Sequence, residues 1–256
     1  NEQTSIEGVA FSRTGLYLTL LQNVKGIILR FQFDSKSGKW SSQPVPLPKN
    51  GTVSISAASV HSETIFINYE DYITPDRLSE FDTLQDKLTL LKSLPSKFNA
   101  NELEVKQHIT TSADGTQVPY FLIHRKGLKT DKKTPTILYG YGGFEISLKP
   151  SYSATIGKLW LERGGAYAVA NIRGGGEFGP RWHKAALKTK RQRAYDDFIA
   201  VAENLIKRGV TSPKHLGISG GSNGGLLVGA IFTQRPDLIN AVVCRVPLLD
   251  MLRYTK

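Results

Sequence analysis

Cysteine is nearly absent from this chain of 256 residues: Cys244 is the only one, so no internal disulfide can form. One thiol fits a reducing compartment, and we expect the protein in the cytoplasm. The chain does not begin with Met and looks cut from something longer, so a missing leader keeps the periplasm open as an alternative. No run of 18 apolar residues occurs, and we therefore expect no membrane partner.

Metal-binding patterns are also missing. The five histidines are scattered along the chain, with neither the H-E-x-x-H nor the C-x-x-C spacing, and we predict no metal. They are His61, His108, His124, His183 and His215.

A glycine-rich segment, Gly174–Gly179, formally fits the dinucleotide pattern G-x-G-x-x-G, and Asp196 follows about twenty residues later. However, Asp196 lies in a helical window, whereas a ribose-binding acid belongs at the end of the next strand. We therefore expect a structural loop near the rim of a site and no cofactor. A dinucleotide-dependent enzyme stays as a weaker alternative.

Positive charge is in excess, with a formal net charge of +11, and much of it lies between Arg181 and Arg193. A basic stripe beside an aromatic residue could contact phosphates, which would fit a non-catalytic binding module. It fits equally a solvated helix face or a surface that meets an acidic partner domain. Because no nucleic-acid motif accompanies the charge, we expect no nucleic-acid partner.

The first half of the chain has the pattern of short strands. Turn-forming segments such as 34–38, 48–51 and 74–76 separate them, which favours a sandwich, a barrel or propeller blades. At about 40–50 residues a blade, this half could hold about two blades. The expected strands are Leu16–Leu21, Gly26–Phe33, Val53–Ala58 and Thr64–Tyr69.

The second half changes to alternating strands and helices. It opens with a hairpin around Asp114-Gly115, because 104–111 and 118–125 flank a strong turn signal. An antiparallel hairpin followed by alternating elements is the order of an α/β-hydrolase sheet. We place the domain boundary between residues 98 and 99. The later expected elements are strands 136–139, 166–172, 216–218 and 241–246, and helices 156–163, 194–208 and 226–232.

Gly220-Gly221-Ser222-Asn223-Gly224 fits the G-x-S-x-G nucleophile elbow. An apolar strand enters it and a helical run leaves it, and this context separates a catalytic serine from a glycine-rich packing turn. The helix that starts after Ser222 would point free N–H groups at a developing oxyanion. We therefore predict Ser222 as the catalytic residue.

A second glycine-rich turn, Tyr139-Gly140-Tyr141-Gly142-Gly143-Phe144, directly follows a strand. In α/β-hydrolases the loop after the third strand supplies part of the oxyanion hole, and a tyrosine hydroxyl can donate one of its hydrogen bonds. Read alone, the segment would be an ordinary turn; together with the elbow, it predicts a role for Tyr141.

A general base is missing from the chain, since no histidine follows Ser222. In this fold the order is Ser, Asp or Glu, then His. Asp250 could formally be the acid, but we expect it to cap or turn the chain. A serine needs a base to become nucleophilic, so we expect this chain alone to be inactive.

Several motif blocks together resemble the prolyl oligopeptidase-type serine peptidases, over about residues 104–256. Asn223 directly after the serine is similar to the prolyl branch, whereas relatives specific for basic residues typically carry Ala there. The blocks are 139–144, 171–179, 182–184, 220–227, 234–238 and 250–252.

The resemblance implies an α/β-hydrolase domain in residues 99–256 and about the last two blades of a seven-bladed β-propeller in residues 1–98, both incomplete. It makes Ser222 the nucleophile, and the Tyr141 hydroxyl with the Asn223 backbone N–H the oxyanion hole. Phe144 and Leu248 would line the proline-binding pocket. The Asp and His of the triad would lie beyond Lys256.

The implied activity is hydrolysis of short peptides after proline, through an acyl-enzyme, by a protein that is monomeric at full length. An esterase or an acyl-aminoacyl peptidase of the same fold is the alternative. Pro247-Leu248-Leu249 departs from the Gly-Val-Met that relatives often carry, which leaves the preference for proline less secure than the reaction class.

Overall fold

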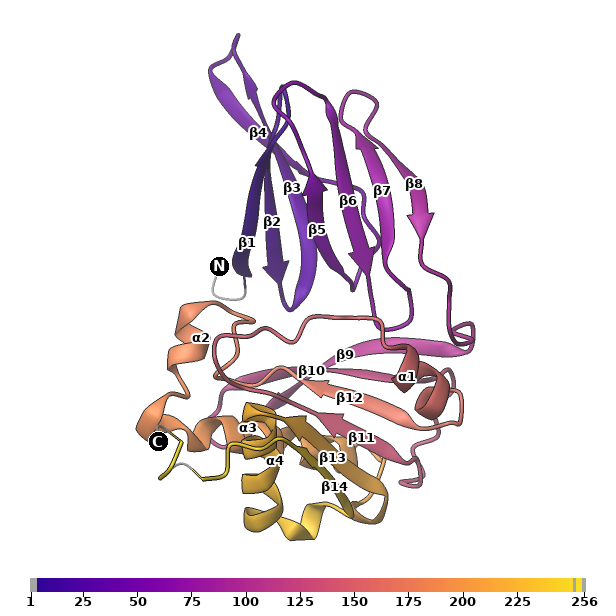
Figure 1. The fold of residues 1–256 in the computed structure, drawn as a ribbon, viewed down its shortest axis with the longest axis vertical. Coiled ribbons are helices and arrows are strands. Elements are labelled where there is room, and N and C mark those ends of the chain that lie inside the picture. Colours follow the sequence, from indigo (N-terminus) through magenta and orange to yellow (C-terminus); the bar gives the residue numbers. More distant parts are fainter. Residues whose placement is uncertain (1–3, 251, 255–256) are drawn as a thin grey trace. The chain divides into compact units, whose positions relative to one another are not determined.

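The computed structural model describes residues 4–250 and 252–254, which form two compact units (Figure 1). The first, here the blade unit, runs to Ser96 and also includes Lys149–Ser153. The second, here the α/β unit, comprises Lys97–Leu148 and the residues from Ala154 onward. The blade unit is therefore discontinuous in sequence.

The blade unit contains two four-stranded antiparallel sheets, in which the strands lie in sequence order. Alternate residues of β6 are buried, and in β2 Tyr17 and residues 19–21 are buried. Tyr17, Ile65 and Ile67 share one core with Phe81. The first sheet is β1 (Thr4–Phe11), β2 (Leu16–Gln22), β3 (Lys25–Asp34) and β4 (Lys39–Pro44); the second is β5 (Thr52–Ala57), β6 (Thr64–Glu70), β7 (Arg77–Asp82) and β8 (Lys87–Ser93).

The segment Lys149–Ser153 is held within the blade unit by three polar contacts. The Thr52 hydroxyl donates to the Pro150 carbonyl oxygen at 2.6 Å, and the Tyr152 N–H donates to the Glu70 carboxylate at 2.8 Å. Lys149 and Glu7 form an ion pair at 2.8 Å.

The α/β unit is built on a six-stranded mixed sheet with the order β14-β13-β11-β12-β10-β9. The hairpin β9–β10 is antiparallel, β12 is antiparallel to β10, and the strands from β12 to β14 run parallel. Their bounds are β9 (Leu103–Thr111), β10 (Gln117–Arg125), β11 (Thr136–Tyr139), β12 (Ala166–Ala170), β13 (Leu216–Gly221) and β14 (Ala241–Arg245).

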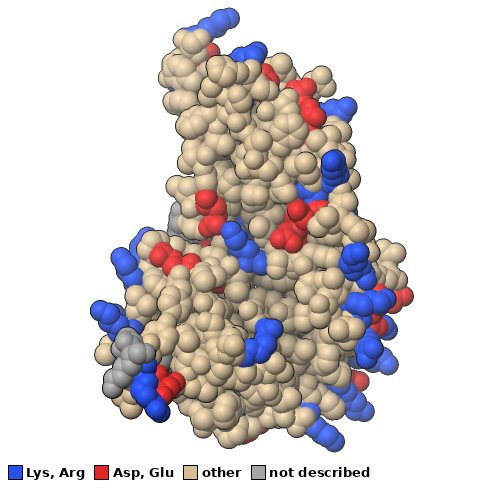
Figure 2. Space-filling view, viewed as in Figure 1, with Lys and Arg blue, Asp and Glu red and all other residues tan. Residues whose placement is uncertain are grey.

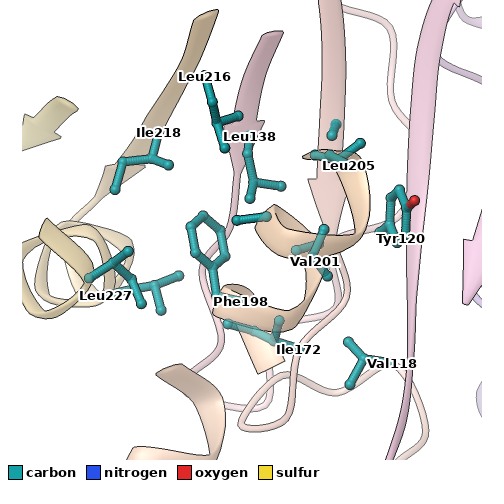
Figure 3. Packing of buried hydrophobic residues seen from close by; sticks show 14 of the residues in the cluster. Val118, Tyr120, Leu138, Ile172, Phe198, Val201, Leu205, Leu216, Ile218 and Leu227 are labelled. Atoms are coloured by element: carbon teal, nitrogen blue, oxygen red, sulfur yellow. The ribbon is translucent and has the colours of Figure 1, made fainter. Parts of the chain in front are cut away.

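Two helices, α3 (Gln192–Lys207) and α4 (Asn223–Gln234), supply much of the core of this unit. Phe198 of α3 and Leu227 of α4 are fully buried and share a cluster with Leu138 and Ile218 of the sheet (Figure 3). This packing fixes both helices against the central strands β11 and β13. The other helical segments are α1 (Ala154–Ile156), a π-helix at Gly157–Leu161, α2 (Pro180–Lys184) and three 3₁₀ turns, at Lys188–Lys190, Pro213–His215 and Pro236–Leu238.

The elements expected from the sequence are present, with ends that differ by a few residues. One difference is the helix expected at 156–163, which begins at Ala154 and continues as a π-helix. The expectation also lacked β1, β4, β7 and β8. None of the described helices is both long and apolar enough to span a membrane.

Candidate active site

Ser222 lies at the sharp bend between β13 and α4, with φ 55° and ψ −117°. This is a backbone conformation that side-chain-bearing residues rarely adopt, and it is the one expected at a nucleophile elbow. The bend is tight because Gly220 and Gly224 touch: a Cβ built on Gly220 would lie 2.1 Å from the Gly224 carbonyl oxygen. Ser222 itself is half-buried and not fully enclosed by the protein.

The backbone after Ser222 leaves the Asn223 N–H available as a donor for a substrate. The Ser222 N–H donates to the Arg245 carbonyl oxygen at 2.9 Å, and the Gly225 N–H donates to the Ser222 carbonyl oxygen at 2.9 Å. Asn223 is the first residue of α4, and within the described part of the chain no hydrogen bond engages its backbone N–H. A free N–H at a helix start favours a developing negative charge beside Ser222.

The loop after β11 is attached to the elbow through the side chain of Asn223. Its Nδ2 donates to the Tyr141 carbonyl oxygen at 2.6 Å, and the side chain is buried. A Cβ on Gly143 would lie 2.4 Å from that Nδ2, so only glycine fits there. The Tyr141 ring lies beside the first turn of α4, since its Cδ2 would be 3.6 Å from a Cβ built on Gly224. The structure therefore brings Tyr141, Ser222 and Asn223 together.

Arg191, just before α3, binds the same two segments. Its Nη1 donates to the Gly142 carbonyl oxygen, and its Nη2 donates to the Asn223 Oδ1 at 3.3 Å. Its guanidinium also lies over the Tyr195 ring, 5.3 Å from the ring centroid. No sequence pattern indicates this role, because Arg191 is only one charge among several in the basic segment.

Arg173 anchors the glycine-rich segment that formally fits the dinucleotide pattern. Its guanidinium binds the buried Asp197 through Nε at 2.9 Å and Nη2 at 2.6 Å, and it also pairs with Asp114. The Arg173 hydrogen bond holds the pKa of Asp114 well below its usual range. Asp197, one residue after the Asp196 of the formal pattern, is thus committed to Arg173 and holds the loop to α3.

Glu177, at the other end of this segment, is a fully buried acid. One carboxylate oxygen accepts from the Leu148 N–H at 3.0 Å and from the Asn171 Nδ2 at 3.4 Å, whereas the other has no partner among the described residues. Loss of hydration on burial raises the pKa of Glu177 from 4.5 to about 7. The sequence alone gave no sign of this buried acid.

The two predicted pocket residues lie in different environments. Phe144 follows Gly143 on the loop after β11; it has φ 54°, and the residue is 59% exposed. Leu248 is half-buried and lies between Pro247, which packs on Gly225, and Leu249, which packs on Gly229. The chain after β14 therefore runs along α4, and Leu248 lies in that segment.

The basic segment is partly used inside the α/β unit. Besides the bonds of Arg191, the Arg193 Nη1 donates to the Ala185 carbonyl oxygen at 3.2 Å. On the face drawn in Figure 2, Lys and Arg side chains lie in separate groups with uncharged surface between them. Among the described residues, no three His, Cys, Asp or Glu side chains gather closely enough to hold a metal ion.

Two family models match the chain along most of its length. That of the prolyl oligopeptidase N-terminal beta-propeller domain matches residues 1–94, and that of the prolyl oligopeptidase family matches residues 150–256. The two define a class of peptidases that combines a propeller with an α/β-hydrolase domain, as the fold class predicted from the sequence requires.

Curated relatives agree with this class. An uncharacterised peptidase of Sinorhizobium fredii is 52% identical over 256 residues, which are 100% of this chain and 35% of that protein. The prolyl endopeptidase of Elizabethkingia meningoseptica is 43% identical over 225 residues, 88% of this chain and 32% of that protein. The chain thus spans about a third of the length of these relatives, and it belongs to the prolyl oligopeptidase family.

Solved structures agree as well. A post-proline cleaving enzyme from Rickettsia typhi superimposes with a TM-score of 0.87 at 39% identity, over 99% of this chain and 36% of that one. Oligopeptidase B from Leishmania major gives a TM-score of 0.85 at 28% identity, over 98% of this chain and 36% of that one. The predicted fold, α/β-hydrolase preceded by propeller blades, is confirmed.

Proposed function

We infer that this chain supplies the nucleophile and the oxyanion-binding loop of a serine peptidase that cleaves short peptides after proline. The observation that carries the inference is the geometry at Ser222. This half-buried serine lies at a strained bend, beside an Asn223 N–H that no other described residue engages. Family membership supports the peptidase reaction, and the relatives named prolyl endopeptidase support the preference for proline.

In the reaction that we infer, the Ser222 Oγ attacks the carbonyl carbon of the proline residue and gives up its proton to a general base. The carbonyl oxygen becomes an oxyanion, which accepts hydrogen bonds from the Asn223 N–H and the Tyr141 hydroxyl. The peptide C–N bond then breaks, the amine leaves with the proton, and the acyl group stays on Ser222. Water attacks this ester and releases the acid, which restores the Ser222 hydroxyl.

The reaction also needs a general base and an acid that orients it. No histidine follows Ser222 in the 256 residues, and we expect Asp250, the formal candidate for the acid, to cap or turn the chain. We infer that an Asp and a His beyond Lys256 provide them. The whole protein would then resemble its relatives in length. We also infer that Phe144 and Leu248 contact the proline side chain of the substrate.

The test uses the protein at the length of its relatives and a fluorophosphonate probe, which reacts with activated serines. We expect labelling at Ser222, and loss of both labelling and peptidase activity in Ser222→Ala. Ser219→Ala, in the preceding strand, is the matched control and should remain active. Full activity of Ser222→Ala, or an unlabelled Ser222, would end the proposal.

The preference for proline needs a separate test. Reporter peptides with Gly-Pro before the scissile bond should be cleaved far faster than the same peptides with Gly-Ala. Faster turnover of short acyl esters or of N-acylated amino acid reporters would instead favour an esterase or an acyl-aminoacyl peptidase.

A further inference from the structure

Arg191 holds together the two parts of the oxyanion site, and nothing in the proposed reaction accounts for it. One donor would come from the Tyr141 side chain, on the loop after β11. The other would come from the Asn223 N–H, at the start of α4. These segments lie 82 residues apart in sequence, so their relative position depends on contacts between them.

Two successive carbonyl groups of the loop are fixed from the elbow side. The Asn223 Nδ2 donates to the Tyr141 oxygen at 2.6 Å, and Arg191 donates to the Gly142 oxygen. Arg191 also donates to the Asn223 Oδ1 at 3.3 Å. The Arg191 guanidinium thus fixes the Gly142 carbonyl group. It also fixes the side-chain amide of Asn223, which in turn holds the Tyr141 carbonyl group.

The guanidinium is itself held in place. It lies over the ring of Tyr195, one helical turn further along α3. The backbone that surrounds it, on the loop after β11 and at Gly174, is closely packed. A Cβ on Gly174 would lie 3.2 Å from the Arg191 Nη1, and one on Gly142 would lie 2.5 Å from the Ile172 side chain. A planar fork with two donors bridges both partners at once, which a lysine ammonium on a flexible stem does less well.

We propose that Arg191 is a positioning residue for catalysis: it sets the Tyr141 hydroxyl and the Asn223 N–H at the distance that a tetrahedral adduct on Ser222 requires. Arg191 does not touch the substrate in this account. The proposal rests on the proposed function, because it needs Ser222 to form that adduct. Its effect should appear in kcat, since the oxyanion forms only after the substrate is bound.

The first experiment replaces Arg191 in the protein at the length of its relatives. Arg191→Met is expected to lower kcat by about 10- to 100-fold with little change in KM, because a small misplacement of catalytic groups has effects of that size. Arg191→Lys should fall between Arg191→Met and the wild type. Arg193→Met is the matched control, since Arg193 contacts Ala185 and Asp114 but neither loop, and its kcat should be unchanged.

A double-mutant cycle separates positioning from general loss of structure. If Arg191 acts through Tyr141, Arg191→Met should cost several-fold less in a Tyr141→Phe background than in the wild type. Fully additive effects, or a wild-type kcat in Arg191→Met, would overturn the proposal. If Arg191→Met does not fold, Arg191→Lys decides, and a wild-type kcat in that variant would also overturn it.

The proposed function and this inference can fail separately. An unlabelled Ser222 would remove the reaction itself. Labelling of Ser222 together with slow turnover of Tyr141→Phe, but normal turnover of Arg191→Met, would remove only the role of Arg191.

Discussion

Ser222 has a backbone conformation that costs about 1–3 kcal/mol and persists only where its surroundings enforce it. Here the enforcing contacts come from both sides of the bend. The Ser222 N–H is bound by the Arg245 carbonyl oxygen at the end of β14, and the Gly220 backbone packs directly on Gly224. Contacts within the α/β unit stabilise this strained conformation, which places Ser222 at the start of α4.

Tyr141 provides the first prediction. If its hydroxyl donates to the oxyanion, Tyr141→Phe should lower kcat by about 10²- to 10³-fold, which is the usual effect of losing one oxyanion donor. Steady-state kinetics on a proline reporter peptide measure this, and KM should change little. Tyr139→Phe is the matched control, since the Tyr139 ring stacks on Tyr167 at 6.4 Å. Equal kcat values for wild type and Tyr141→Phe would contradict the assignment.

Glu177 predicts a pH dependence of stability. Its pKa is raised to about 7, so the folded protein holds the proton more tightly than the unfolded chain. Stability from this group is therefore present below pH 4.5 and is lost as the pH rises through 7. A shift of that size corresponds to about 3 kcal/mol.

The measurement compares melting temperatures of wild type and Glu177→Gln from pH 5 to pH 8. Glu177→Gln stays neutral, so its melting temperature should gain on that of the wild type as the pH rises. A constant difference between the two proteins over this range would show that Glu177 does not titrate there.

The residues of the site could be predicted from sequence only where chemistry imposes a local pattern. Ser222 and Tyr141 lie in glycine-rich turns that follow strands, and such turns are visible in sequence. Arg191 gave no such signal, because its contacts with Gly142 and Asn223 depend on how α3 packs. The same holds for the bond between Arg173 and Asp197, whose residues lie 24 positions apart.

At the level of elements, the glycines of the segment 174–176 let the loop after β11 pack directly against their backbone. A Cβ on Gly174 would lie 2.4 Å from the Gly142 carbonyl oxygen, and one on Gly176 would lie 2.2 Å from the Glu145 carbonyl oxygen. Phe144 and Glu145, with φ 54° and 57°, lie where the loop packs against the segment 174–176. Close backbone contact explains the run of glycines without any phosphate ligand.

Gly176→Ala should therefore displace the loop that carries Phe144. The added methyl group meets backbone, which cannot rotate away, and we expect about 1–3 kcal/mol of destabilisation. We also expect a higher KM for proline reporter peptides. Gly217→Ala in β13 is the control, because a Cβ there meets nothing closer than 3.6 Å. An unchanged KM and melting temperature in Gly176→Ala would refute this reading of the loop.

Two of the four strands that were not expected from the sequence, β4 and β8, share a physical cause. All residues of β4 are exposed, and β8 is exposed at six of its seven positions, so neither shows the alternation of buried and exposed residues that identifies a strand. They form because β3 and β7 offer unpaired edges, a property of the sheet and not of the local sequence. The strand β6 was predictable for the opposite reason, because alternate residues of it are buried.

At the scale of the whole molecule, the chain of 256 residues is expected to hydrolyse no peptide by itself. The chain carries Ser222 and the proposed oxyanion donors, but no histidine follows Ser222 within these residues to act as a base. Turnover of a proline reporter should be absent in the 256-residue chain and present in the protein at the length of its relatives. Measurable Ser222-dependent turnover by the shorter chain would show that its base lies within these residues.

The five residues Lys149–Ser153 also bear on any attempt to take the protein apart. A cut near residue 97 would split the polypeptide, yet the N-terminal piece would still grip this short stretch of the other piece through Thr52 and Glu70. A gene beginning at residue 97 would carry the stretch without its partners. Producing the blade unit or the α/β unit alone will therefore require redesign of the segment Lys149–Ser153.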